Sequence, residues 1–214
     1  MHIRTFVAPG FAENSYLAWK ARSAVAIDPG SDSAALIDAL RTENLQLDAI
    51  LLTHAHIDHI EGVAALKRHA DAPIYMHSAD RAFYDNAGAQ AAQFGMQVEK
   101  LPPVDKPFAH EQRLRVAGIE FEVRHVPGHS PGHVLLYVEE DKIAFVGDVV
   151  FQGSIGRTDL PGGSYQQLMQ SIRNHVMTLP NETRLYCGHG PATTVQEERT
   201  YNPFIAPMYG GSFA

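Results

Sequence analysis

The chain has 214 residues, and its shares of 45% hydrophobic and 19% charged residues are typical of a globular protein that buries a core. The formal net charge of −7 at pH 7, with histidine counted as neutral, argues against a nucleic-acid partner, because phosphate-binding surfaces are basic. No apolar run approaches the ~20 residues that span a membrane, so no membrane partner is expected, and the single cysteine excludes an internal disulfide bond.

The N-terminus does not resemble a secretory signal, which combines a basic start with an apolar stretch of about 7 to 15 residues. Together with the lack of cysteine pairs, this predicts a cytoplasmic protein. A secreted enzyme that degrades antibiotics is disfavoured on the same ground.

The first part of the sequence predicts alternating strands and helices. An antiparallel meander that ends in the turn Asp28-Pro29-Gly30 is expected from strands at 3–7, 15–19 and 24–27. Ser31 or Ser33 is expected to cap a helix at 34–42. The elements that follow are a strand at 49–52, a helix at about 60–70 and a strand at 73–77.

The segment between residues 86 and 110 is rich in Ala, Gln, Gly and Pro, and Leu101-Pro102-Pro103 interrupts regular structure. We interpret it as a surface crossover, and a mobile flap beside the functional site is the alternative. Ser164 is expected to cap a helix that ends at Met177. Further strands are expected at 114–126, 134–138, 142–146 and 184–188.

A run of metal-ligand residues, from Thr53 to His59, follows directly on the apolar strand at 49–52. It holds three histidines and an aspartate, and imidazole and carboxylate are the groups that zinc and similar cations bind. Three further candidates each follow another apolar or glycine-marked segment. Because chance placement of seven such residues at strand ends is improbable, we predict a metal centre built from His54, His56, Asp58, His59, His129, Asp148 and His189.

The other histidines carry no such pattern, and a single His-x-His is weak evidence by itself. We expect surface or packing roles for His2, His69, His77, His110, His125 and His175.

The seven residues resemble the signature of the metallo-β-lactamase superfamily, which is His-x-His-x-Asp-His followed by a later His, an Asp and a final His. Within it, the chain is most similar to glyoxalase II (hydroxyacylglutathione hydrolase), especially its short bacterial single-domain relatives. The segments that carry this finer likeness are Val149-Val150-Phe151, Pro127-Gly128-His129-Ser130-Pro131-Gly132-His133 and Tyr186-Cys187-Gly188-His189-Gly190-Pro191.

The resemblance implies an α/β fold, a four-layer αβ/βα sandwich in which helices flank two mixed β-sheets. It implies a single domain over residues 1–214, without the separate helical domain of full-length glyoxalase II. The tail at 201–214 is expected to pack on the sandwich, and mediating a dimer is the alternative. The sequence leaves the oligomeric state open.

The resemblance also implies two divalent metal ions per chain, with zinc as the first choice and iron or manganese as alternatives. One ion is assigned to His54, His56 and His129, and the other to Asp58, His59 and His189, with Asp148 bridging both. A metal-bridging hydroxide would hydrolyse a small-molecule thioester, such as the glutathione conjugate S-lactoylglutathione. Asp58 is the expected catalytic residue, as a ligand that also orients the nucleophile.

Several neighbouring residues are candidates for supporting roles. Arg157 is expected to bind a carboxylate of glutathione, and a surface arginine without a ligand is the alternative. Hydrogen bonds that orient the metal ligands are expected from Thr53, Asp28 and His133, for which a strand end, a turn and a strand edge are the structural alternatives. Cys187 is expected to be a small core residue.

Two other functions compete with the hydrolase. The persulfide dioxygenase branch of the superfamily uses one iron held by two histidines and an aspartate. The segments that resemble it are Gly156-Arg157-Thr158-Asp159 and Glu198-Arg199-Thr200, whereas those that favour the hydrolase are His133, Tyr186-Cys187-Gly188-His189-Gly190 and Asn202-Pro203-Phe204. A non-catalytic metal-binding module ranks last, because it would be expected to lack a ligand.

Overall fold

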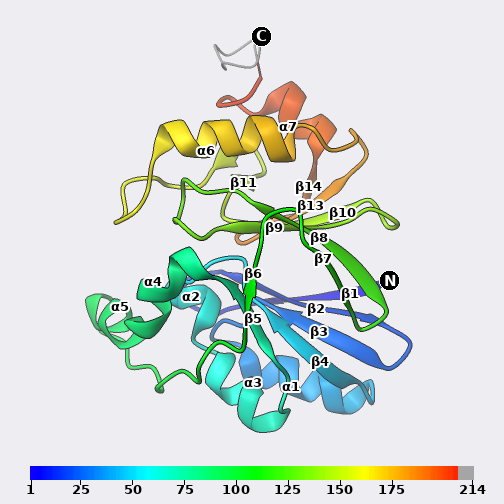
Figure 1. The fold of residues 1–214 in the computed structure, drawn as a ribbon, viewed down its shortest axis with the longest axis vertical. Helices are drawn as coiled ribbons and strands as arrows, with labels where there is room; N and C mark the ends of the chain where they lie inside the picture. The colour runs from blue at the N-terminus through cyan, green and yellow to red at the C-terminus, as the bar shows by residue number, and fades with distance from the viewer. Residues whose placement is uncertain (207–214) are drawn as a thin grey trace.

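The computed structural model describes residues 1–206, which form two large β-sheets packed face to face with helices on both outer sides (Figure 1). The layers run helix, sheet, sheet, helix. This arrangement confirms the predicted α/β class and the four-layer αβ/βα sandwich.

The N-terminal sheet runs in the order β1-β2-β3-β4-β5-β6. Its strands are β1 (His2–Val7), β2 (Asn14–Lys20), β3 (Ser23–Ile27), β4 (Gln46–Leu51), β5 (Ile74–His77) and β6 (Lys106–Phe108). The pairs up to β3 are antiparallel, which confirms the meander, and those from β3 to β6 are parallel. Parallel neighbours need crossovers, which are α1 (Ser33–Thr42), α2 (Ile57–Ile60) and α3 (Val63–His69) in the first two cases.

The C-terminal sheet runs in the order β14-β13-β10-β9-β8-β7. Its strands are β7 (Arg113–Val116), β8 (Ile119–His125), β9 (Val134–Val138), β10 (Ile143–Gly147), β13 (Arg184–Cys187) and β14 (Thr193–Thr194). Neighbouring strands are antiparallel except β10 and β13. After β10 comes a small hairpin of β11 (Val150–Phe151) and β12 (Ser154–Ile155).

The crossover from β10 to β13 contains α6 (Tyr165–Ser171), which continues as a π-helical turn (Ile172–Val176), and α7 (Val195–Tyr201) follows β14. Ser164 caps α6 as predicted, because its hydroxyl accepts a hydrogen bond from Gln167 N at 3.4 Å. The apolar face of this helix consists of Leu168, Ile172 and Val176, which are fully buried.

Successive side chains of the central strands point to opposite faces of their sheet, so the core consists of one layer between the sheets and one layer beneath the helices on each side. In β4, Ile50 packs beneath α1 and α3, whereas Leu51 packs between the two sheets. In β9, Leu136 faces the other sheet and Leu135 faces α6. Successive side chains of a strand point to opposite faces, so these central strands are buried on both sides and read as continuous apolar runs.

The helix predicted at 60–70 is wrong in its boundaries. The chain forms α2, breaks at Gly62 and resumes as α3. Gly62 N donates to Pro29 O at 2.8 Å, and a Cβ at Gly62 would lie 2.3 Å from Gly30 O. The break therefore gives room to the turn at Asp28-Pro29-Gly30, and α2 carries Asp58 and His59 on a helical turn.

Two further expectations need correction. The N-cap of α1 is Asp32 and its side chain makes no capping hydrogen bond, so neither Ser31 nor Ser33 caps the helix. The crossover at 86–110 is more regular than predicted, since it holds α5 (Ala87–Gln93) and β6, and α4 (Arg81–Asp85) precedes it. Among residues 1–206, no helix is long and apolar enough to cross a membrane. Of the tail, residues 207–214 lie outside the described part.

The strand ends that precede the predicted ligands meet at one edge of the sandwich. β3 and β4 are parallel, as are β10 and β13, so in each sheet the carboxyl ends of the pair lie at the same edge. Packing the sheets face to face brings these edges together (Figure 1). Residues that follow β4 therefore lie opposite those that follow β10 and β13.

Candidate metal centre

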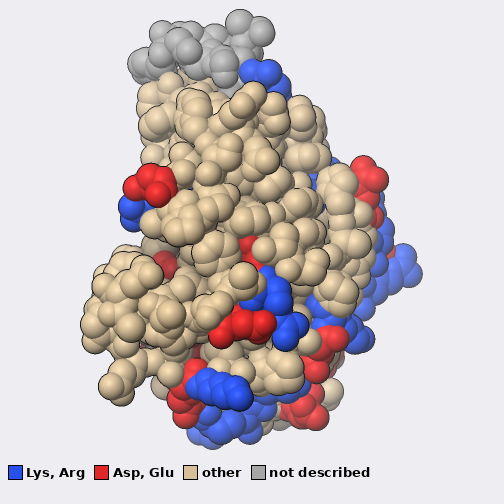
Figure 2. All heavy atoms as spheres, turned by 60° about the vertical axis from the view of Figure 1, so that its left-hand side comes forward, with Lys and Arg blue, Asp and Glu red and all other residues tan. Residues whose placement is uncertain are grey.

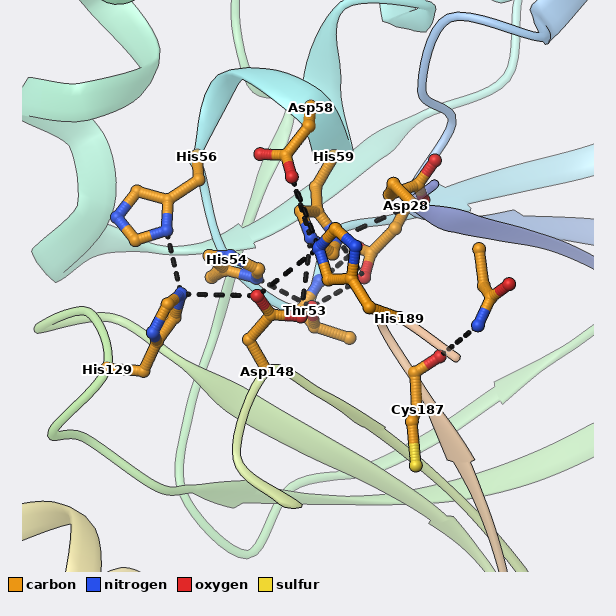
Figure 3. Close-up of polar contacts among 12 residues, drawn as sticks. Asp28, Thr53, His54, His56, Asp58, His59, His129, Asp148, Cys187 and His189 are labelled. Atoms are coloured by element: carbon orange, nitrogen blue, oxygen red, sulfur yellow. Dashed lines mark hydrogen bonds and ion pairs between the residues drawn. The ribbon is translucent and has the colours of Figure 1, made fainter. Parts of the chain in front are cut away.

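Six of the seven predicted ligands form two neighbouring groups, and the seventh, Asp148, lies beside both (Figure 3). In each group, the possible ligand atoms all lie within 4.8 Å of one another. The first group comprises His54, His56 and His129, and the second comprises Asp58, His59 and His189.

Asp148 lies between the two groups. Its Oδ2 is 3.5 Å from His129 Nε2 in the first group and 3.5 Å from His189 Nε2 in the second. Its Oδ1 is 3.4 Å from His59 Nε2. A carboxylate offers two oxygens with several lone pairs, so this side chain can serve two cations at once.

Two histidines are oriented through Thr53 and Asp28. Thr53 Oγ1 donates to Asp28 Oδ2 at 2.6 Å and lies 3.1 Å from His54 Nδ1. Because that hydroxyl proton is used, the threonine oxygen accepts from His54 Nδ1. His59 Nδ1 likewise lies 3.2 Å from Asp28 Oδ2. Both Nδ1 atoms therefore donate a hydrogen bond, which directs both Nε2 atoms towards the centre.

The backbone orients two more histidines in the same way. His129 Nδ1 lies 2.8 Å from Arg157 O, and His189 Nδ1 lies 3.2 Å from Phe11 O. A carbonyl can only accept, so Nδ1 donates in each case and Nε2 is directed towards the other members of the two groups. His56 differs, because its Nδ1 approaches His129 Nε2 at 2.8 Å. Two ring nitrogens at that distance need a shared proton or a common cation to avoid repulsion.

Several atoms of the cluster lack partners. Within residues 1–206, Nε2 of His54, His56 and His59 and Oδ1 of Asp148 are buried and accept or donate no hydrogen bond. Each unpaired buried polar atom costs about 1–3 kcal/mol, so four in one place are unfavourable unless a cation binds them. Imidazole nitrogen and carboxylate oxygen are the donors that divalent transition metals and zinc bind. The residues present therefore fit metal ions.

The electrostatics favour cations as well. Burial lowers the pKa of His54 and of His56, the latter to about 3, so both rings stay neutral and keep a lone pair. Burial also lowers the pKa of His59, but the charges of Asp58 and Asp148 raise it more, so that it lies above its usual value. The second group therefore attracts positive charge.

Residues 8–189 match the sequence profile of the metallo-β-lactamase superfamily, a span that includes both ligand groups and Asp148. The chain belongs to this superfamily.

Individual relatives agree with this assignment. The chain is 37% identical over 209 residues to hydroxyacylglutathione hydrolase GloC of Haemophilus influenzae, an alignment covering 96% of this chain and 98% of that protein. It is 38% identical to the crystal structure of BLEG-1, a B3 metallo-β-lactamase, with a TM-score of 0.91 and coverage of 96% and 100%. It is 40% identical to TTHA1623 in a di-iron-bound form, with a TM-score of 0.87 and coverage of 94% and 99%. The predicted family and fold are confirmed.

Asp28 also satisfies the distance criterion for a ligand, together with His54 and His59. Its two oxygens, however, accept hydrogen bonds from Thr53 N at 2.7 Å and Thr53 Oγ1 at 2.6 Å. The left-handed φ of +47° at Asp28 turns the chain sharply after β3. We interpret Asp28 and Thr53 as residues that orient metal ligands of the superfamily site, in line with the expectation from the sequence.

His133 supports Asp148 rather than joining the ligands. Its Nε2 accepts a hydrogen bond from Asp148 N at 3.0 Å, and its ring stacks on that of His54 at 4.7 Å. Burial keeps the pKa of His133 well below its usual value, with the neighbouring His129 as the next cause. A neutral ring that accepts through Nε2 carries its proton on Nδ1, so it has no lone pair left for a cation.

A cavity of about 580 Å³ opens onto the ligands, and Arg157 is among its lining residues. The guanidinium is exposed and forms a forked ion pair with Asp159, with two contacts of 2.8 Å. Its backbone carbonyl holds His129, a role that the sequence did not reveal. Cys187, the last residue of β13, is buried in the core as expected, and burial raises the pKa of its thiol.

Asp80 is a supporting residue that sequence reasoning missed. Its side chain is fully buried and accepts hydrogen bonds from Ala55 N at 3.0 Å, from Ser130 Oγ at 2.8 Å and from Gly132 N. Ala55 lies between two ligands of the first group, and Ser130 follows the third, His129. One carboxylate therefore ties together the two loops that carry the first group. The signal was faint, because Asp80 stands in an ordinary helix-start context in the sequence.

The N-terminal strands hold His189 in a similar way. Asn14 Nδ2 donates to Cys187 O at 2.9 Å and to Gly190 O at 2.7 Å. Tyr16 donates its hydroxyl proton to the same Cys187 carbonyl. The contacts span more than 170 residues of sequence, so local patterns give no sign of them.

Proposed function

We propose that the protein is a binuclear metallohydrolase that cleaves thioesters of the hydroxyacylglutathione type. Its similarity to hydroxyacylglutathione hydrolase GloC, over nearly the full length of both chains, supports this reaction class. The observation that carries the proposal is the position of Asp148, whose carboxylate faces ligands of both groups at 3.4 to 3.5 Å. A site for one metal would not need a carboxylate between two complete sets of donors.

Two bound divalent cations would supply Lewis acidity, which polarises a carbonyl oxygen and lowers the pKa of water to about 7. Hydrolysis joins the oxygen of water to the acyl carbon, breaks the carbon–sulfur bond and leaves the proton on the thiolate. Asp58 lines the cavity, and Asp58 Oδ2 lies 3.2 Å from His189 Nε2. Burial raises the pKa of Asp58, but His59 and His189 lower it more, so the group stays an acceptor that can orient water and carry its proton.

Arg157 is the proposed contact for a glutathione carboxylate. A guanidinium binds a carboxylate through two parallel hydrogen bonds, and Asp159 occupies that fork in the free protein. A substrate carboxylate would therefore have to displace Asp159, which moderates the gain in affinity. Both side chains are exposed, so the exchange needs no rearrangement of the core.

We propose zinc as the metal and iron as the alternative. The donor set of imidazoles and carboxylates accepts either ion. The neighbour TTHA1623 was crystallised in a di-iron-bound form, which supports the alternative. Metal analysis of protein purified without added metal decides between them.

The test combines metal content with an anaerobic assay on S-lactoylglutathione. A binuclear hydrolase should contain close to two metals per chain and should release thiol without oxygen, since water is its second substrate. Asp58→Ala should lower turnover by at least a hundredfold in a protein that stays folded. Full activity in this variant with both metals bound would remove Asp58 from the mechanism.

A persulfide dioxygenase is the alternative that the same experiment separates. It would contain close to one iron and would consume oxygen with glutathione persulfide. Oxygen uptake without anaerobic thioester cleavage would overturn the hydrolase and leave the first ligand group intact. The chromogenic β-lactam nitrocefin serves as a third substrate, because the neighbour BLEG-1 is a B3 metallo-β-lactamase.

A further inference from the structure

A phenylalanine ring packs against one member of each ligand group at the cavity. The ring of Phe83 packs edge-on against His56 at 5.7 Å, and that of Phe151 packs edge-on against His189 at 6.0 Å. Ile57 and Phe94 line the same cavity. The reacting centre is therefore bordered by apolar side chains.

Phe94 forms the outer part of this wall. Its ring meets that of Phe11 at 5.1 Å and an interplanar angle of 89°, which joins the end of α5 to the loop between β1 and β2. The Phe94 side chain is nevertheless 57% exposed. A phenyl ring left in water at the mouth of a cavity gains free energy when an apolar group covers it, at about 25 cal/mol per Å².

Charges are scarce around this wall. Residues 86–98 and 160–172, whose members Gln90, Phe94 and Leu160 line the cavity, contain no Asp, Glu, Lys or Arg. Figure 2 brings the side of α4 and α5 forward and shows a surface with few charged side chains over most of the left and upper parts of the view, whereas charged side chains gather in the middle, in the lower part and along the right side. Within the described residues, Arg157 is the one Lys or Arg that lines the cavity, and Asp159 already neutralises it.

The scarcity of charged side chains around the wall determines which half of a glutathione thioester can bind there. Glutathione carries two carboxylates and an ammonium group, which remain solvated or need charged partners. The two carboxylates gain nothing from an uncharged aromatic surface. The acyl half carries no charge and is the part that can cover Phe94.

We propose that Phe11, Phe83 and Phe94 form a subsite for an extended apolar acyl group, so that the protein prefers alkanoyl or arylalkanoyl thioesters to the small, hydroxylated lactoyl thioester. This inference rests on the proposed hydrolase. The reacting carbonyl lies at the metal ligands, the acyl chain lies along Phe83 towards the Phe11–Phe94 pair, and the thiol half points to the cavity mouth near Arg157. The reaction remains hydrolysis, in which water supplies the hydroxyl of the acid and a proton for the thiol.

A chain-length series tests the subsite. The substrates are glutathione thioesters of acetate, butanoate, hexanoate and phenylacetate, compared with S-lactoylglutathione by kcat/KM. Burial of a methylene is worth about a fourfold factor when complete, so we expect kcat/KM to rise roughly two- to fourfold per methylene in this half-open site. Phe94→Ala should reduce this increase of kcat/KM with chain length, and the largest loss of kcat/KM should occur with the hexanoate thioester. Phe94→Leu should restore most of the increase.

Tyr165→Ala is the matched control. Tyr165 is 55% exposed, close to the value for Phe94, but it lies on α6 outside the cavity lining. This variant should keep the wild-type increase of kcat/KM with chain length, because it removes an aromatic surface of similar exposure without touching the subsite. An equal kcat/KM across the series, or an equal effect of both alanine variants on this increase, would overturn the subsite.

Binding of thioethers keeps the two proposals distinguishable. S-hexylglutathione cannot be hydrolysed, and calorimetry on the metal-loaded protein should show it binding at least tenfold more tightly than S-methylglutathione. Phe94→Ala should remove most of this difference. Tight hexyl binding without turnover of any thioester would overturn the proposed hydrolase and keep the subsite, whereas turnover with equal binding of both thioethers would overturn the subsite alone.

Discussion

Replacing Asp80 by asparagine should weaken the first metal site without abolishing the fold. The carboxylate accepts from three donors on the two loops that carry His54, His56 and His129. An amide of the same size keeps one acceptor oxygen and turns its NH₂ group towards at least one of these donors. The two loops then lose their common anchor.

The magnitude follows from the number and kind of bonds lost. A hydrogen bond to a charged acceptor contributes about 1.5–3 kcal/mol, and a buried N–H left unpaired costs about 1–3 kcal/mol. Losing the bond to Gly132 N or to Ala55 N should therefore cost roughly 2–4 kcal/mol in total, shared between folding and metal binding. Changes at residues that orient metal ligands typically reduce affinity by about 10- to 100-fold, and we expect this range for the first site.

The assay is competition with a chromophoric chelator, which resolves the two binding steps, together with thermal unfolding of the metal-free protein. Ser130→Ala removes one of the three donors and should give a smaller loss than Asp80→Asn. Asp105→Asn is the control, because that carboxylate also accepts from a backbone N–H, Ile74 N at 2.9 Å, but lies on the segment before β6. First-site affinity within twofold of wild type in Asp80→Asn, or an equal loss in Asp105→Asn, would refute the reasoning.

Three other predictions concern the site and its surroundings. Gly188→Ala should abolish binding of at least one metal, because its Cβ would lie 2.0 Å from Asp148 Oδ1. Arg157→Ala should raise KM for S-lactoylglutathione with little change in kcat, whereas Asp159→Ala should lower KM by freeing the guanidinium. Burial and the neighbouring His125 hold the pKa of His77 at about 4, below its ordinary value of 6.5, so this group contributes stability at neutral pH that is lost as pH falls from 6.5 towards 4. Because the ring is half exposed, the loss of unfolding free energy between pH 6.5 and pH 4 is at most about 2 kcal/mol. The unfolding free energy of His77→Gln should therefore decrease less than that of wild type as the pH is lowered.

Each of these has its own check. Gly88→Ala introduces a Cβ with open space around it and should leave the metal content at the wild-type value, unlike Gly188→Ala. If Arg157→Ala and Asp159→Ala both raise KM, the ion pair stabilises the loop and Asp159 does not compete with the substrate for Arg157. Identical pH dependence of urea unfolding in wild type and His77→Gln would exclude the depressed pKa of His77 as a source of acid lability.

The convergence of the proposed ligands was predictable from sequence because each of them follows a recognisable strand. Asp148 comes after β10, and His189 comes two residues after β13, so the end of an apolar run marks each position. The layer arrangement was predictable only through the resemblance, since strand and helix patterns allow several ways of stacking two sheets. The division of the helix at Gly62 escaped prediction, because it depends on contact with Pro29, more than 30 residues earlier.

The supporting residues were predictable only where they adjoin a ligand. Thr53 and His133 lie beside the motifs and were found, whereas Asp80 and Asn14 act on loops far away in the chain. The choice between a carboxylate that caps a helix and one that joins two loops is made by tertiary packing. Neither composition nor spacing carries that information for Asp80.

The order of the proposed ligands along the chain would set the order in which the two metal sites can be filled during synthesis. The first group is complete once residue 129 has left the ribosome, whereas the second waits for His189, which is 60 residues later. At about 5–20 residues per second, this delay is roughly 3 to 12 seconds. The docking of Asn14 on the loop around His189 must wait equally long, so the first strands to be made are among the last to find all their contacts. A nascent chain that captures an ion early would hold it with the first group alone until its final strands emerge.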